Sequence, residues 1–243
     1  MKIIYEPRGA AREYAELALN HYLGCTHQCS YCYVPNTLHI SKEDYFGEPA
    51  MREGIIAKVA SDAKYLADNG CDSEILLSFI GDPYQPCETE LGLTRQIIEI
   101  LMRYNLRFTV LTKGGTRACR DFDLFEKYEK CSFGTSLVFS HNDSATKYEP
   151  NAASVSDRQD AVMEASKRGI KTWVSMEPVI IPEEALDVLV FLGKDVDFWK
   201  IGKINHNKEL ESRVDWAGFR EEAKRILDNM DAKYYIKRSL SEL

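Results

Sequence analysis

The stretch GCTHQCSYCY, residues 24–33, carries the thiols of Cys25, Cys29 and Cys32 in the spacing CxxxCxxC. Iron–sulfur clusters are held by cysteine thiolates, normally four. Three clustered thiolates leave one iron of a [4Fe–4S] cluster without a protein ligand, and an open iron can bind and react with a small molecule. The spacing therefore predicts a catalytic cluster rather than a centre that only stores electrons.

Three alternatives to an iron–sulfur cluster could also explain this cysteine spacing. Positions i, i+4 and i+7 share one face of a helix, although Gly24, Pro35 and the polar residues between the cysteines make a poor helix. A zinc site would use the three thiolates with His21 or His27, although no distant second CxxC pair is present. A disulfide framework is disfavoured because the chain has seven cysteines and no secretory signal.

Length and composition set the class of protein. The 243 residues, 44% of them hydrophobic, can build a sizeable core of the size found in α/β barrels. The formal net charge is -7. Because proteins that bind duplex DNA or RNA usually carry a basic face, extended nucleic acid is disfavoured as a partner.

The first residues, MKIIYEPRGAAREY, carry charges where a signal peptide needs an apolar run. Nowhere does the sequence approach the roughly 18 apolar residues of a membrane helix. We therefore expect no membrane association and a cytoplasmic location, which also suits an oxygen-sensitive cluster.

Strand and helix patterns alternate along the chain. Apolar runs indicate strands, and apolar residues at helical spacing indicate helices between them. Strict alternation implies a parallel sheet with right-handed crossovers, in a closed barrel or an open doubly wound sheet. We expect one domain, with an N-terminal extension over 1–14 and a core over 15–237. The expected strands are 14–22, 74–80, 107–112, 132–138, 171–176, 198–202 and 233–237, and the expected helices are 49–69, 89–104, 122–128, 156–168, 183–192 and 216–230.

Reactive residue types gather where the expected strands end. In α/β barrels the catalytic groups stand at the carboxyl ends of the strands. All five histidines fall on this face by the expected topology. The residues that follow successive strands are His21 and the cysteines, Asp82 and Tyr84, Lys113, His141, Glu177, and finally Lys203, Asn205 and His206.

The motif CxxxCxxC with Tyr31 just before its last cysteine resembles the signature of the radical S-adenosylmethionine (SAM) enzymes. The resemblance implies that Cys25, Cys29 and Cys32 bind a [4Fe–4S] cluster and that the amino and carboxylate groups of SAM chelate its open iron. It favours a partial (β/α)6 barrel over the other α/β arrangements. It also implies an electron donor such as flavodoxin or ferredoxin.

The resemblance assigns further residues to SAM. Gly81 and Asp82 are similar to the second-strand motif that meets the SAM amino group, although Asp-Pro is also a common turn opener. Lys113 resembles a lysine that faces the SAM carboxylate in spore photoproduct lyase-like proteins, and a solvated lysine is the alternative. The remaining candidates are Ser136 for the ribose, Glu177 for ribose hydroxyls or substrate amino groups, and Tyr31 for adenine, with a core tyrosine as the alternative.

Four segments are similar to the spore photoproduct lyase-like branch of this family, over nearly the full chain: residues 5–35, DPYQPCE (82–88), SMEPVI (175–180) and YYIKRSL (234–240). Members of this branch either repair a DNA lesion or release the base queuine from queuosine or its phosphate. The short, acidic chain favours the second group, a lyase that cleaves the C–N glycosidic bond of a small nucleoside. DNA lesion repair is the alternative, and a non-catalytic cluster or zinc protein is an alternative of another class.

A planar deazapurine base needs stacking surfaces and polar partners. Cys87, on the second catalytic loop, is a candidate donor of a hydrogen atom to a product radical, whereas Cys71, Cys119 and Cys131 read as buried free thiols. The aromatic candidates for the substrate are Tyr33, Phe79, Tyr84 and Phe139, and the polar ones are Glu177, His21, Asn205 and His206.

Overall fold

An eight-stranded sheet organises the protein in the computed structural model, which describes residues 2–204 and 207–242. The predictions for Asn205 and His206 therefore lie outside the described residues. Strands β2 to β10 of this sheet pair in parallel, and β1 pairs antiparallel with β2. In spatial order the strands are β1 (Ile4–Tyr5), β2 (Leu17–Leu19), β5 (Ile75–Leu77), β6 (Phe108–Thr112), β7 (Cys131–Ser136), β8 (Thr172–Val179), β9 (Phe198–Lys203) and β10 (Tyr234–Ile236).

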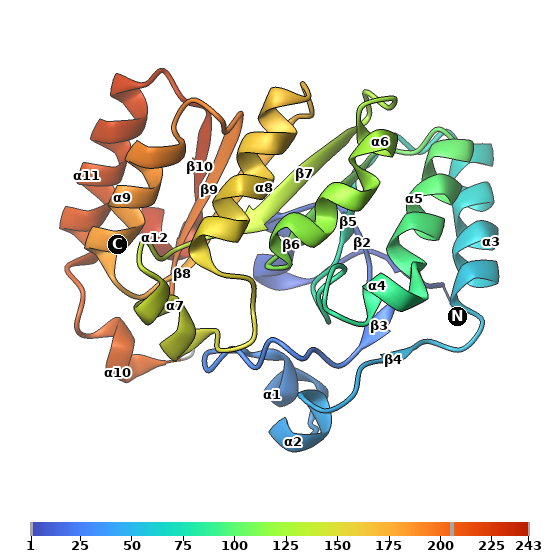
Figure 1. The fold of residues 1–243 in the computed structure, drawn as a ribbon, viewed down its shortest axis with the longest axis horizontal. Helices are drawn as coiled ribbons and strands as arrows, with labels where there is room; N and C mark the ends of the chain where they lie inside the picture. The colour runs from blue at the N-terminus through green and yellow to red at the C-terminus, as the bar shows by residue number, and fades with distance from the viewer. Residues whose placement is uncertain (1, 205–206, 243) are drawn as a thin grey trace.

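Helices follow the strands and cover one face of the sheet. Figure 1 shows the longer ones side by side in a row, from α3 at one edge to α11 at the other. The longer helices are α3 (Ile55–Asp68), α5 (Leu93–Arg103), α8 (Val155–Lys167), α9 (Pro182–Leu192) and α11 (Trp216–Asn229). The other helices are η1 (Gly9–Glu13), α1 (Val34–Leu38), α2 (Lys42–Tyr45), α4 (Glu88–Leu91), η2 (Gly115–Asp121), α6 (Phe122–Phe125), α7 (Asn142–Tyr148), α10 (Lys208–Glu211) and α12 (Arg238–Ser241).

The apolar core lies on both faces of the sheet. The larger cluster fills the space between the strands and the helix row, and fully buried side chains such as Phe133 and Trp199 belong to it. A smaller cluster, with Ala18, Leu76 and Trp173 at its centre, lies on the inner face. Each fully buried large apolar side chain stabilises the fold by about 1.5–3 kcal/mol. The α/β class with a parallel sheet is therefore confirmed, with one strand–helix unit starting at each of β2, β5, β6, β7, β8 and β9.

Two predicted helices have different boundaries. The helix expected from residue 49 begins at Ile55, because Ala50–Met51 forms strand β4 and pairs with β3 (Tyr22–Leu23) in a separate two-stranded sheet. The helix expected over 89–104 is divided into α4 and α5 at Gly92, whose φ of 58° is left-handed.

Several strand ends also differ from expectation: the first strand, expected over 14–22, is only Leu17–Leu19, and β7 ends at Ser136. Two further differences shape the site. Strand β5 ends at Leu77, because the Asn20 Oδ1 atom accepts hydrogen bonds from the backbone N–H groups of Phe79 and Ile80 at 2.8 Å each. Strand β8 continues to Val179, and its register with β9 shifts between Met176 and Val179. Glu177 therefore stands in an irregular stretch of strand rather than in a loop.

The segment expected as an N-terminal extension is bonded to both edges of the sheet. At one edge Ile4 of β1 pairs with Leu19 of β2. At the other edge the Glu13 Oε2 atom accepts hydrogen bonds from the Tyr235 hydroxyl and the Arg238 backbone N–H, both at 2.9 Å. Residues 4–14 thus cross the opening between the edge strands.

Among the described helices, none has the length and apolar character needed to cross a bilayer.

Candidate active site

A cavity of about 720 Å³ opens at the carboxyl ends of the parallel strands. Every strand from β5 to β9 contributes a lining residue at or just beyond its end, and the N-terminal segment closes one side. The lining includes Cys25, Cys29 and Cys32 from the cysteine loop, Asp82, Lys113 and Ser136 from the next three strands, and Glu177 and Lys203 from β8 and β9.

The cysteine loop, residues 24–33, is fixed by hydrogen bonds to its backbone. The Cys25 N–H donates to the carbonyl oxygen of Tyr45 at 3.0 Å. The fully buried Gln85 accepts from the Thr26 N–H at 3.1 Å and donates to the Gly24 carbonyl at 3.4 Å. These bonds give partners to three backbone groups of a loop that has no regular secondary structure to pair them, and so they stabilise its conformation.

Two glycines let the cysteine loop approach the loop that follows β5. Gly81 has a φ of 72°, and a Cβ atom there would lie 2.8 Å from the Gly24 carbonyl oxygen. Gly24 has a φ of 87°, and its Cβ atom would lie 3.0 Å from the Tyr45 carbonyl oxygen. Both conformations and both contacts require glycine. The Gly81-Asp82 motif is thereby packed directly against the cysteine loop.

The three thiols fit a cluster with one open iron. All three cysteines are free, and all line the same cavity. Burial raises the pKa of the Cys25 and Cys29 thiols to about 12, so metal loading must displace their protons. Within residues 2–204 and 207–242, no three His, Cys, Asp or Glu side chains converge on a single-ion site. Cluster ligands need no such convergence, because each thiolate binds a different iron.

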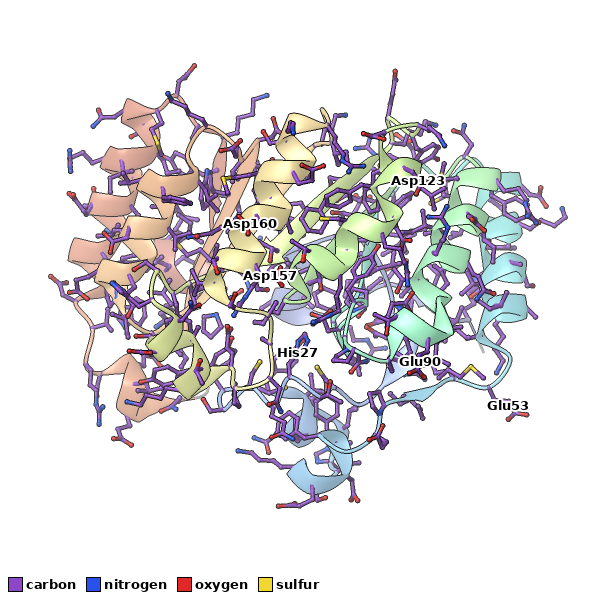
Figure 2. All side chains as sticks on the ribbon, viewed as in Figure 1. His27, Glu53, Glu90, Asp123, Asp157 and Asp160 are labelled. Atoms are coloured by element: carbon purple, nitrogen blue, oxygen red, sulfur yellow. The ribbon has the colours of Figure 1, made fainter. Side chains whose placement is uncertain are left out.

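His27 lies within the cysteine loop and offers a polar atom to this region. It is 1% exposed, its Nδ1 atom is 3.6 Å from Asp82 Oδ2, and its Nε2 atom is buried without a hydrogen-bond partner. Figure 2 shows His27 where the cysteine loop meets the segment that leads into α8. An unpaired buried nitrogen at a cavity wall is consistent with a cofactor in that cavity.

Asp82, in the loop after β5, accepts hydrogen bonds from its own loop and from the end of β6. Its Oδ1 atom accepts from the Tyr84 N–H at 2.8 Å and the Thr112 hydroxyl at 2.5 Å, and its Oδ2 atom accepts from the Lys113 N–H at 2.7 Å. Both carboxylate oxygens are therefore engaged by protein donors. The side chain holds the β5 and β6 loops in place at the wall of the cavity.

Lys113 supplies positive charge to the cavity. Its Nζ atom lies 5.8 Å from the centre of the Tyr31 ring and 3.9 Å from Glu149 Oε1. Burial lowers the pKa of Lys113, but Cys29 and Glu149 raise it more, so the net shift is upward. The ammonium group is thus cationic at neutral pH, beside the three thiols.

Glu177 is held by two residues that the sequence patterns missed. The Tyr14 hydroxyl donates to Glu177 Oε2 at 2.5 Å, and Lys237 Nζ donates to the same oxygen at 2.6 Å. Burial and the Glu177 charge raise the pKa of Tyr14 well above its ordinary value, so the phenol stays protonated. Lys237 follows the last strand and lies in the segment YYIKRSL (234–240), but neither signal marks it as a site residue. Tyr14 lies in the segment taken for an extension.

Three residues predicted as substrate contacts do not line the cavity. His21 is fully buried, its Nε2 atom lies 2.9 Å from the Thr94 hydroxyl, and burial lowers its pKa to about 3. The Tyr84 hydroxyl donates to Asp121 at 3.1 Å, and the Phe139 ring stacks on Tyr148 at 5.5 Å. Each side chain leaves its strand end on the side of the helices, which sequence position alone does not reveal.

Cys87 is also outside the cavity lining, at the start of α4. The cavity lining therefore gives no support to the predicted donation of a hydrogen atom from Cys87 to a product radical. Phe79 and Tyr33 do line the cavity, and Tyr33 is 47% exposed at its mouth. Among the described histidines, His27 lines the cavity, whereas His21, His39 and His141 do not.

Known proteins resemble this chain in sequence and in fold. A protein of Methanocaldococcus jannaschii, described as uncharacterized, is 27% identical over 185 residues, which cover 76% of this chain and 67% of that protein. An uncharacterized protein of Acidianus two-tailed virus is 25% identical over 199 residues, covering 75% of this chain and 63% of the viral protein. The chain thus spans less than two thirds of the viral relative.

Solved structures show the same fold. Spore photoproduct lyase complexed with dinucleoside spore photoproduct has a TM-score of 0.71 and 16% identity, over 96% of this chain and 79% of that one. Streptococcus suis SuiB bound to S-adenosylmethionine has a TM-score of 0.67 and 12% identity, over 93% of this chain and about half (52%) of that one. The family model described as the radical SAM superfamily matches residues 19–192. Because this match spans most of the chain and includes the cysteine loop, the chain belongs to the radical SAM superfamily, whose cofactors are a [4Fe–4S] cluster and SAM.

Proposed function

We propose that this radical SAM enzyme acts on a small nucleoside, with queuosine or its 5′-phosphate as the best candidate. It would cleave the C–N glycosidic bond and release queuine. The observation that carries the proposal is the shape of the site. One cavity of about 720 Å³ is lined both by the three cysteines and by Glu177 with its partners Tyr14 and Lys237. Residues from the segment 5–14 form one side of it. Cavities of about 300–1,000 Å³ are typical of small-molecule sites.

The cofactor end of the cavity is assigned by position. Cys25, Cys29 and Cys32 would hold the cluster, and Lys113, with Gly81, would hold the methionine end of SAM. When bound, these cofactors supply a 5′-deoxyadenosyl radical that takes a hydrogen atom from the substrate. The Lys113 charge attracts a carboxylate, and the fixed Asp82 keeps the two loops that carry Gly81 and Lys113 in register. For the adenosyl group we propose the lining residues Ser136 and Tyr31.

The substrate end is lined by aromatic and polar groups. Phe79 and Tyr33 offer ring faces to a planar base. Glu177 is a preorganised acceptor, because Tyr14 and Lys237 fix its carboxylate before any ligand binds. The chain's part in the reaction is then to orient the nucleoside beside SAM and to exclude water. We also propose that an electron donor such as flavodoxin or ferredoxin reduces the enzyme and that the enzyme acts in the cytoplasm.

The test is a SAM-cleavage assay across candidate substrates. The enzyme is reconstituted anaerobically with iron and sulfide and incubated with dithionite, SAM and one of queuosine, queuosine 5′-phosphate, adenosine or irradiated thymine-rich DNA, and products are identified by mass. We expect 5′-deoxyadenosine together with free queuine. If products form only from the irradiated DNA and from none of the nucleosides, the enzyme repairs a DNA lesion and the proposal is wrong. Failure to form the coloured cluster would favour a non-catalytic metal protein.

A further inference from the structure

A buried ion pair lies behind the cysteine loop and has no part in the proposed reaction. Arg158 Nη2 is 2.5 Å from Glu149 Oε2, and the two residues are 1% and 2% exposed. Neither residue lines the cavity. Because a buried ion pair adds little net stability compared with packed apolar residues, its presence calls for a reason other than stability.

Glu149 reaches the cofactor site through two cavity residues. The Tyr31 hydroxyl donates a hydrogen bond to Glu149 Oε1, and Lys113 Nζ lies 3.9 Å from the same oxygen. Tyr31 stands between Cys29 and Cys32 in the cysteine loop. One buried carboxylate therefore fixes the Tyr31 ring, next to two predicted cluster ligands, and lies near the Lys113 ammonium group.

Arg158 reaches the end of the neighbouring strand. Its Nη1 atom donates to the carbonyl oxygen of Ser136 at 2.9 Å, at the end of β7. Its Nε atom donates to the carbonyl oxygen of Ala153 at 2.9 Å, in the loop before α8. The guanidinium group thus connects Glu149 to the strand end that carries Ser136.

The backbone between these two residues also binds the cysteine loop. The Ser30 N–H donates to the Tyr148 carbonyl oxygen at 2.8 Å. Asn151 donates from its N–H to the His27 carbonyl oxygen at 3.2 Å and from Nδ2 to the Thr26 carbonyl oxygen at 3.0 Å. The whole segment from the end of α7 to the start of α8 is packed on the cysteine loop.

We propose that Glu149 and Arg158 are positioning residues that hold the cysteine loop against the end of β7 and set the charge behind the cluster. Burial by itself would raise the pKa of Glu149, but the Arg158 and Lys113 charges bring it below its ordinary value, so the carboxyl group is ionised. The negative charge of Glu149 offsets the positive charge of Arg158. The three groups Glu149, Arg158 and Lys113 together therefore carry one net positive charge. The inference rests on the cluster and not on the nucleoside substrate.

Charge near the cluster changes its reduction potential. The potential of an iron–sulfur cluster depends on its net charge, on hydrogen bonds to its sulfurs and on solvent exposure. Loss of the nearby anion makes the addition of an electron easier, and loss of the nearby cation makes it harder. A pair with only a structural role would lower stability in both variants without moving the potential in opposite directions.

The first experiment measures the midpoint potential of the reconstituted holoenzyme by redox titration followed by EPR. We expect a higher potential than wild type in Glu149→Gln and a lower one in Arg158→Gln, with a raised KM for SAM in Arg158→Gln because Ser136 loses its anchor. Potentials equal to wild type, or shifted in the same direction in both variants, would overturn the proposal.

A second variant is used because removing one partner of a buried ion pair can prevent folding. Tyr31→Phe keeps the ion pair and removes only the hydrogen bond to Glu149. We expect iron to leave the reconstituted cluster about tenfold faster in the presence of a chelator, as for other residues that orient metal ligands. The matched control is Tyr128→Phe, which loses one phenol hydrogen bond, to the Leu106 carbonyl at 2.7 Å, at the opposite end of the strands. Equal rates of iron loss in Tyr31→Phe and the control would contradict the proposal.

Discussion

Cys29 is the middle thiol of the cysteine loop, and its removal is the most direct test of the site. Cys29→Ala leaves two thiols in the loop, too few to retain a cluster with one open iron. We expect loss of bound iron and sulfide and loss of 5′-deoxyadenosine formation. The fold should persist with a loss of about 1 kcal/mol in unfolding free energy, because the substitution removes only one sulfur atom and Gln85 still holds the loop. Cys71→Ala, outside the cavity lining, is the control and should keep its cluster.

Lys200 gives a pH-dependent contribution to stability. Its Nζ atom donates to the Tyr14 carbonyl oxygen at 2.6 Å and lies 5.0 Å from the centre of the Trp173 ring. Burial lowers its pKa from 10.5 to about 8. Between these two pH values the unfolded chain binds a proton that the folded chain has released, so the contribution of Lys200 to stability rises with pH. Below about pH 8 the lysine is charged in both states.

The comparison of wild type with Lys200→Met isolates this effect, since other titrating groups are common to both proteins. Chemical unfolding is measured at several pH values from 7 to 10. The wild type should gain stability relative to the variant as the pH rises through about 8. A constant difference would show that the folded protein does not perturb this lysine.

The contacts of single residues were predictable from the sequence only when their partners are close along the chain, although strand ends did indicate Asp82, Lys113 and Glu177 as residues of one cavity. The three cysteines lie within eight consecutive residues, so their spacing survives in the sequence. Glu149 bonds to a tyrosine 118 positions away, and Lys237 bonds to Glu177 60 positions away. No local pattern encodes such pairs. For the same reason the direction of His21, at a strand end, could not be read from its position.

Among the elements, the loop after β5 depends most on one residue. Gly81→Ala would place a Cβ atom 2.8 Å from the Gly24 carbonyl oxygen in a left-handed conformation. The conformation alone costs about 1–2 kcal/mol, and relief of the contact must move the cysteine loop. We expect a loss of stability larger than this cost and weaker SAM binding by calorimetry.

Gly169→Ala is a matched control for that substitution. Gly169 has the same φ of 72°, but nothing lies within 4 Å of its Cβ position. Its variant should lose only the conformational part of the stability and bind SAM as the wild type does. Equal effects of the two variants would mean that the contact between the loops is unimportant.

Element types were predictable, whereas several boundaries were not. Apolar runs such as 107–112 and helical spacing as in 216–230 are local signals, and β6 and α11 lie where those signals place them. The late start of α3 depends on pairing between β3 and β4, and the early end of β5 depends on the Asn20 side chain. Both causes are tertiary contacts, which periodicity does not contain.

At the scale of the whole molecule, the sheet is open and residues 4–14 cross its opening. The segment pairs with β2 at one edge and bonds through Glu13 to Tyr235 and Arg238 at the other. Its residues Tyr5, Arg8 and Tyr14 also line the cavity. The same short segment therefore spans the opening of the sheet and forms one wall of the cavity. A domain core that begins at residue 15 would lack that wall.

Glu13→Ala tests this connection, because it removes the acceptor of both bonds at the β10 edge while leaving the β1–β2 pairing intact. Each hydrogen bond to a partly exposed carboxylate contributes about 1 kcal/mol, so the global loss of stability should be small. Amide hydrogen exchange of residues 6–14 should accelerate, whereas that of β5 should not change. In turnover, more 5′-deoxyadenosine should form per product released, because buffer solutes and the reductant reach and quench a less enclosed radical. Glu16→Ala, an exposed neighbour, is the control. If both variants exchange and turn over as the wild type does, the segment covers the sheet opening without enclosing the site.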